Sequence, residues 1–164
     1  MESSWEARID QFWHDFDGSN PLEMIEKMRV LVTERHRDDA AGLYELASVH
    51  DSTGRTSQAI EFYRLALDAG LDARRMPRAL LQLASSLRAE GRLEECLAVL
   101  DDARSSGEAA LAVIGDADSV VRALALHDLG RHDEALRVAL LPLARDLPLY
   151  ERSMTAYANA LVTP

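Results

Sequence analysis

The chain has 164 residues, the length of one domain, and a chain of this size can bury roughly 68–70% of its unfolded surface without disulfides or metals. Its formal net charge of −10 argues against nucleic acid as a partner and disfavours an anionic membrane surface, because such polyanions are bound by clustered Lys and Arg. With 48% hydrophobic and 28% charged residues, the composition is that of a globular protein whose core consists mainly of Ala and Leu.

The N-terminal sequence and the longest apolar runs indicate where in the cell the protein is expected. The first twenty residues carry acidic side chains throughout, and no apolar run in the chain approaches the ~20 residues that a membrane-spanning helix needs. We therefore expect no secretory signal and no membrane segment. With a single cysteine, the expected location is cytoplasmic.

Residues 1–37 are predicted to form two capping helices. The first begins at the capping-box sequence Ser3-Ser4-Trp5-Glu6, and the second begins at Asn20-Pro21 and runs to about Arg35. Four aromatic residues lie in the first helix, so they either pack on the helices that follow or form the interface of a homodimer. These residues are Trp5, Phe12, Trp13 and Phe16.

One short pattern recurs along the middle of the chain. The dipeptide Gly-Arg occurs at residues 54–55, 91–92 and 130–131, with glycines 37 and then 39 residues apart. The flanking residues agree with this spacing, because small residues align with small ones and large residues with large ones. One position that is small in every copy is occupied by Ala59, Cys96 and Ala135. A period of this length indicates a helical repeat, with the third copy weaker than the others.

Each copy is predicted to contain two helices, because apolar residues recur at steps of three and four on both sides of the glycine. Glycine permits the left-handed backbone that ends a helix, and Thr56 is placed to cap the helix after the first Gly-Arg. Small residues such as Ala47, Ala59 and Ala66 allow two helices to cross closely, whereas bulky side chains would force them apart.

The best copy, GLYELASVHDSTGRTSQAIEFYRLALDAG, resembles the tetratricopeptide repeat. The matching residues are Leu43, Leu46-Ala47, Gly54, Ala59, Tyr63 and Ala66. His50 stands where an aromatic residue is usual, and Leu71 where proline is usual. The strings YELASVHDSTGR and LALHDLGRHDEAL are similar to a bacterial subgroup of these repeats. The resemblance implies an all-α fold: three helix-turn-helix repeats over residues 38–146, in a short right-handed superhelix of eight or nine helices with capping helices at both ends.

The end of the chain, residues 147–164, is predicted to form one C-terminal capping helix. Pro142 and Pro148 are expected to interrupt the helical pattern before it. Its inward residues are expected to be Leu149, Met154, Tyr157 and Leu161. The segment from Ser105 to Asp116 is ambiguous, since two glycines bracket a short apolar run with helical spacing.

We expect the residues that could be catalytic or bind a metal to have structural roles instead. His127 and His132 are five residues apart and straddle Gly130, whereas a helical metal pair prefers a separation of four on one face. His50 is expected to fill an aromatic position and Cys96 a small buried one. No phosphate loop, paired cysteine cluster or nucleophile elbow occurs in the sequence, so we expect no catalytic residue, metal or cofactor.

The resemblance implies a protein or peptide as partner, bound in a concave groove that the first helix of each repeat lines. The groove residues expected from this alignment are Tyr44, Ser48, Asp51, Arg78, Leu81, Ser85, Arg88, Val120, Leu124 and His127. They lack the Lys and Asn residues of the clamp with which some family members bind chaperone tails. Arg78 and Arg88 suggest a ligand with acidic groups. The functional hypotheses are therefore an adaptor that binds a partner segment in this groove and a self-assembling homodimeric scaffold, with an enzyme a distant third.

Overall fold

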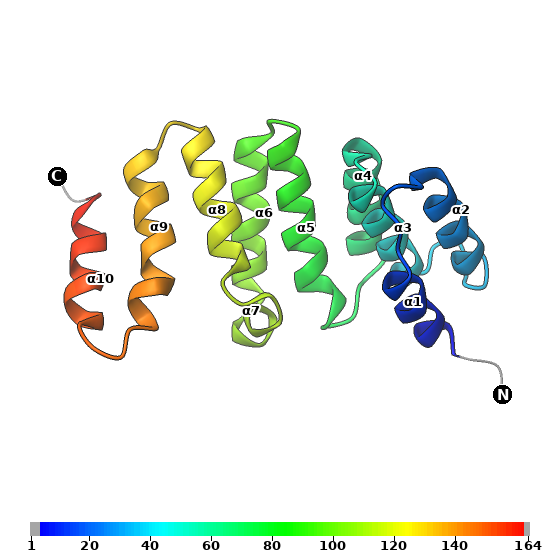
Figure 1. Ribbon diagram of the computed structural model, residues 1–164, viewed down its shortest axis with the longest axis horizontal. Coiled ribbons are helices and arrows are strands. Elements are labelled where there is room, and N and C mark those ends of the chain that lie inside the picture. The colour runs from blue at the N-terminus through cyan, green and yellow to red at the C-terminus, as the bar shows by residue number, and fades with distance from the viewer. Residues whose placement is uncertain (1–3, 163–164) are drawn as a thin grey trace.

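The computed structural model describes residues 4–162, and within that range the chain forms ten α-helices and no strand (Figure 1). The helices lie in one elongated row, with the two ends of the chain at opposite ends of that row. Two helices begin the row, α1 (Trp5–His14) and α2 (Pro21–Val32), and α10 (Glu151–Ala160) ends it. Between them lie the pairs α3 (Ala40–Ser52) with α4 (Thr56–Asp68), α5 (Arg75–Ala89) with α6 (Leu93–Ser105), and α8 (Ala117–Asp128) with α9 (His132–Arg145). The all-helical repeat architecture expected from the sequence is confirmed.

The Gly-Arg dipeptide forms the same turn in all three pairs. Gly54 has a φ of +72°, which favours glycine, and the glycines of the other two copies have similar values. In each copy the glycine N–H bonds back three residues and the arginine N–H bonds back five, as from Arg55 to the His50 carbonyl at 2.8 Å. These two bonds define the Schellman motif, which ends the first helix and sets the direction of the second.

The small residues of the repeats lie where the helices cross. Ala47, Ala59, Ala84 and Cys96 have no exposed surface, and Ala135 is buried as well. They belong to one continuous core that includes residues of α3 to α6, α8 and α9. Since each helix pair buries its apolar side against the next pair, the core extends along the row.

The number of helices corrects one expectation, because the described residues form ten helices and not eight or nine. The additional element is α7 (Glu108–Ile114), which lies in the ambiguous segment between α6 and α8. The expected interruption at Pro142 is also wrong, since α9 continues through this proline to Arg145. Packing of the last turn, where Ala144 is buried, offsets the hydrogen bond that proline cannot donate. Two residues expected to point inward at the C-terminal end, Leu149 and Tyr157, are instead 67% exposed, because few residues of α10 are buried.

Three details at helix ends also differ from expectation. Arg55, and not Thr56, is the N-cap of α4, because Thr56 already lies in the first helical position. Asn20 is the N-cap of α2, but its side chain bonds to Asp17 and not to the helix. At α1 the N-cap is Ser4, whose hydroxyl accepts from the Ala7 N–H at 3.3 Å, while Ser3 of the expected capping box lies outside the described residues.

Candidate functional site

A cavity of about 340 Å³ lies where α1 meets the first helices of the first two repeats, α3 and α5. Three of the expected groove residues, Tyr44, Ser48 and Arg78, line it. The remaining lining residues are Glu6, Ile9, Asp10, Trp13, Glu45, Ser52, Arg74, Arg75 and Gln82. Acidic side chains of α1 therefore face arginines of α5 across one hollow.

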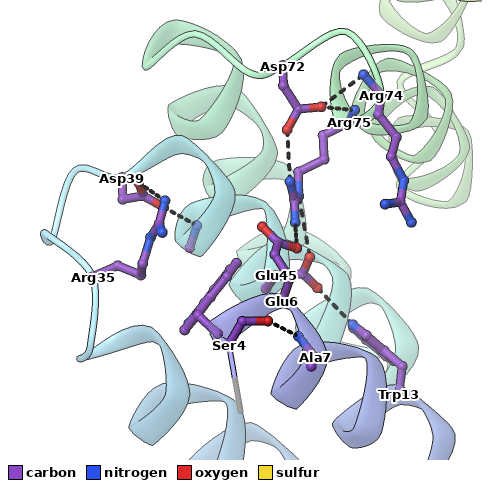
Figure 2. Close-up of polar contacts among 12 residues, drawn as sticks. Ser4, Glu6, Ala7, Trp13, Arg35, Asp39, Glu45, Asp72, Arg74 and Arg75 are labelled. Carbon is purple, nitrogen blue, oxygen red and sulfur yellow. Dashed lines mark hydrogen bonds and ion pairs between the residues drawn. The ribbon is translucent and has the colours of Figure 1, made fainter. Parts of the chain in front are cut away.

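A polar network fixes α1 beside α3 and α5 (Figure 2). The Trp13 indole N–H donates to the Glu45 carboxylate at 2.7 Å. Arg75 forms ion pairs with Glu6 and with Asp72, the latter at 2.8 Å, and its Nε lies 3.7 Å from Glu45. Since Arg75 is 69 residues from Glu6 in sequence, this network joins distant parts of the chain beside the cavity.

Glu45 is the most deeply buried charged side chain at this site, with 4% of its surface exposed. Burial, the largest influence, raises the pKa of its carboxyl, although the Trp13 hydrogen bond and the positive charge of Arg75 act in the opposite direction. Glu45 therefore lines the cavity with little exposed surface, and its carboxylate is held by Trp13 and Arg75. A ligand would meet the more exposed charges of α1 and α5.

Two arginines at the start of α5 face the cavity without an ion-pair partner among the described residues. Arg74 is the N-cap residue of α5, Arg78 lies four residues further along, and both line the cavity. Within residues 4–162 neither guanidinium has an ion-pair partner, and Figure 2 shows the Arg74 guanidinium apart from the network of Arg75. The charge of Arg78 acts on Tyr44, whose pKa is raised mainly by burial. This edge of the cavity is thus positively charged and accessible.

The other expected groove residues of the first two repeats differ in accessibility. Asp51 is half-buried and accepts a hydrogen bond from the Ser86 hydroxyl at 3.0 Å. Leu81 is half-buried against the core, whereas Ser85 is exposed. Arg88 forms an ion pair with Asp128 at 2.7 Å across α5 and α8, so its guanidinium is already occupied.

In the third repeat the expected groove residues are exposed. Val120 and Leu124 have 58% and 42% of their surface exposed, which is high for aliphatic side chains. His127 is exposed, and its ring lies 4.8 Å from that of His132 across the Gly130 turn. Among residues 4–162 no group of three or more His, Cys, Asp or Glu side chains is placed to hold a metal ion.

The four aromatic residues near the N-terminus pack within the chain, but Phe16 lies two residues beyond the end of α1 and not, as expected, in the first helix. Trp5 and Phe12 are buried with residues of α2 and α3, and Trp13 and Phe16 are half-buried against the same cluster. The Trp5 indole N–H also donates to the Leu31 carbonyl at 2.9 Å. The four side chains thus form a cap that packs on the first repeat. The homodimer through this helix stays a prediction, and no large exposed aromatic surface supports it.

The two remaining residues singled out by sequence have the structural environments expected for them. His50 is buried and stacks on Phe62, with ring centroids 5.3 Å apart and 20° between the planes, so it fills the aromatic position of the repeat. Cys96 is buried in the core, and burial raises the pKa of its thiol. A raised pKa keeps the thiol protonated and weakly nucleophilic.

Sequence reasoning missed Arg74, Glu45 and Arg75. Arg74 had a visible signal, because it precedes Arg78 by four residues on the same helix. Glu45 and Arg75 had none, because their roles depend on how α1 folds back over α3 and α5. No signal in the sequence indicated that Arg88 would be paired with a residue forty positions away.

Comparison with known proteins agrees with this architecture. The family model described as "Tetratrico peptide repeat" matches residues 40–161, which is most of the chain and includes all three helix pairs. No curated protein and no solved structure matches the chain significantly. No described helix is long and apolar enough to cross a membrane. The chain therefore belongs to the tetratricopeptide repeat family.

Proposed function

We propose that this protein is an adaptor that binds an extended segment of a partner protein along α3, α5 and α8. Membership in the repeat family supports a protein-interaction scaffold as the general class of function. It does not favour an enzymatic function. In the proposed complex, one carboxylate of the bound segment lies at the cavity between α1, α3 and α5. We place this interaction in the cytoplasm, where a single buried, reduced cysteine is usual.

The observation that carries the proposal is the pair of unpartnered arginines at the edge of this cavity. The chain has 28 acidic and 18 basic residues, and most of its arginines form an ion pair among residues 4–162. Arg74 and Arg78 have none among the described residues, although they lie side by side in a hollow. One helical turn separates them, about 6 Å along the axis, which suits a single carboxylate held between two guanidiniums.

This geometry changes the ligand expected from the sequence. Arg78 and Arg88 would lie about 15 Å apart and would suit two separate acidic groups. Because Arg88 is paired with Asp128, the second guanidinium is supplied by Arg74. Further along the same surface, Val120 and Leu124 offer exposed apolar contact. The ligand that fits is a segment with one acidic residue at the cavity and apolar side chains towards α8.

The acidic edge of the cavity restricts how such a segment can bind. Glu6 and Asp10 line the side formed by α1, and the whole chain has a net charge of −10. An acidic ligand therefore gains no long-range attraction, and its affinity depends on short-range contacts with the two arginines. We expect the affinity to fall at high salt concentration, because the arginines are exposed.

Selection from a phage-displayed library of linear peptides tests this proposal. We expect enriched peptides to contain Asp or Glu beside apolar residues, and the Arg74→Ala, Arg78→Ala double variant to bind them at least tenfold more weakly, about 1.4 kcal/mol. The matched control is Arg29→Ala with Arg55→Ala, which removes the same charge from residues outside the cavity. The proposal fails if no peptide is enriched, or if the cavity variant binds as the wild type does.

A further inference from the structure

The last two helices of the row carry an apolar surface that the described part of the chain leaves uncovered. Of the fourteen large apolar residues with exposed surface among residues 4–162, nine lie within residues 136–162. Helix α10 packs on α9, and few residues of this hairpin are buried: Ala135 and Ala144 in α9 and Ala158 in α10. By contrast, α5 buries seven residues. The C-terminal end of the stack therefore presents side chains that an interior repeat would bury.

These side chains converge on one trough of about 320 Å³ between α9 and α10. Its lining residues are Leu136, Leu140, Leu143, Ala144, Leu147, Met154, Tyr157, Ala158 and Leu161. Every one of them is apolar or, for the tyrosine, largely so. An apolar trough of this kind accepts helices and not extended polar chains.

The spacing of the trough residues is that of a helical bundle. From Leu136 in α9 to Leu147, two residues beyond its end, the large residues advance by four, three and four positions. From Met154 in α10 to Leu161, its C-cap residue, they advance by three and four. Steps of three and four are the pattern with which helices pack around a shared core in four-helix bundles. Two antiparallel helices supply half of such a core.

We propose that a second copy of this chain covers the trough, so that α9 and α10 of two protomers form a four-helix bundle about a two-fold axis. A two-fold interface requires a surface that is complementary to itself, and two identical apolar troughs with this spacing meet that requirement. This interface goes beyond the adaptor function proposed above and lies at the opposite end of the stack. It also differs from the aromatic helix α1, whose side chains the chain itself covers.

The charges near the trough permit two copies to approach. Residues 132–162 contain four acidic and three basic residues, a net charge of −1, whereas the whole chain has −10. Nearly all of the acidic excess therefore lies away from this end of the molecule. A strongly basic partner would gain little from such a surface, and a second copy would meet little repulsion.

The exposed area is sufficient for a dimer of moderate affinity. Six large residues of the trough have between 36% and 67% of their surface exposed. Leu140 has the lowest exposed fraction, and Leu143 and Tyr157 have the highest. With about half of roughly 200 Å² exposed on each, the trough offers on the order of 600 Å² per protomer. The total of about 1,200 Å² is the lower end of the range for stable protein interfaces.

Sedimentation velocity of the full chain, from about 1 to 200 µM, tests the proposal. We expect the wild type to pass from monomer to dimer over this range. Leu143→Glu and Tyr157→Glu should each keep the protein monomeric at the highest concentration, at least a tenfold weakening, because both side chains are 67% exposed and the change buries a charge only in the dimer. Leu65→Glu on α4 is the matched control, since Leu65 is also exposed and lies outside the trough.

Three results would overturn the proposal. The first is a wild type that stays monomeric at 200 µM, and the second is a dimer that neither trough variant weakens. The third is assembly that Leu22→Glu or Val30→Glu on α2 abolishes, because this would show head-to-tail contact between the two ends of the stack. Circular dichroism tests whether each variant is folded. If a glutamate variant unfolds, Leu143→Ser and Tyr157→Ser repeat the comparison without an added charge.

Discussion

Replacing Ala84 with leucine tests whether the small residues set the distance between helices. Ala84 has no exposed surface and belongs to the continuous core of the repeats. Its equivalent in the first repeat, Ala47, is equally buried. Three additional carbon atoms have no free space at such a position, so α5 must move away from its neighbours. We expect Ala84→Leu to lower the free energy of unfolding by about 1–3 kcal/mol.

Urea denaturation followed by circular dichroism at 222 nm measures this change. The expected loss corresponds to a fall in the thermal midpoint of about 2–12 °C for a chain of this length. Ser85→Leu is the control, because Ser85 is the next residue, is exposed, and should change stability by no more than about 0.5 kcal/mol. Equal midpoints for Ala84→Leu and the wild type would show that the helix crossing described here is wrong.

Three further changes probe the core and its buried charges. Leu100→Ala should cost about 2–5 kcal/mol by urea denaturation, because Leu100 is fully buried and its removal leaves a cavity; a loss below about 1 kcal/mol would contradict this packing. Asp118→Ala should cost about 1.5–3 kcal/mol, because it removes a buried carboxylate that accepts from Arg104 at 2.7 Å and lies 4.0 Å from the mostly buried Arg122, which keeps its ion pair with Asp101; a change within error would show that these contacts are not formed. In the folded state the pKa of the Glu45 carboxyl is raised above its ordinary value of 4.5. The protonated carboxyl therefore stabilises the fold at pH values below 4.5, and this stabilisation is lost as the pH rises through the folded pKa. Glu45→Gln should therefore gain stability relative to the wild type between pH 4 and pH 7, and a difference independent of pH would refute the assignment.

The sequence predicted those features of the fold that depend on local, position-specific residues. Each Gly-Arg dipeptide forms a helix end by itself, and each small residue marks a helix crossing, so the three repeats could be recognised from their spacing. Helix α7 could not be predicted with the same certainty, because seven residues are too few for a clear helical period. The predicted helix break at Pro142 was wrong, because the packing of α9 outweighs the low helix propensity of proline.

The candidate site depended on contacts that sequence spacing does not record. The exposed face of α5 could be predicted from its helical period, and Arg78 is accessible as expected. Whether Arg88 was also accessible depended on Asp128, which reaches it only because α8 packs beside α5. In the same way, α1 creates the cavity by folding over α3 through Trp13 and Glu45. Such long-range pairs are set by tertiary structure and not by local pattern.

The two ends of the stack differ in a way that connects the two proposals. At the N-terminal end, α1 covers the first repeat with an aromatic cluster and leaves a charged cavity beside Arg74 and Arg78. At the C-terminal end, α9 and α10 leave an apolar trough uncovered. A two-fold dimer through the troughs would place the two cavities at its far ends, because α1 and α10 lie at opposite ends of the row (Figure 1). Such a dimer could hold two partner segments at once, and when both segments belong to one assembly, bivalent binding can exceed the affinity of a single site by about 10²–10⁴. A weak contact between one carboxylate and two exposed arginines would then suffice for stable attachment.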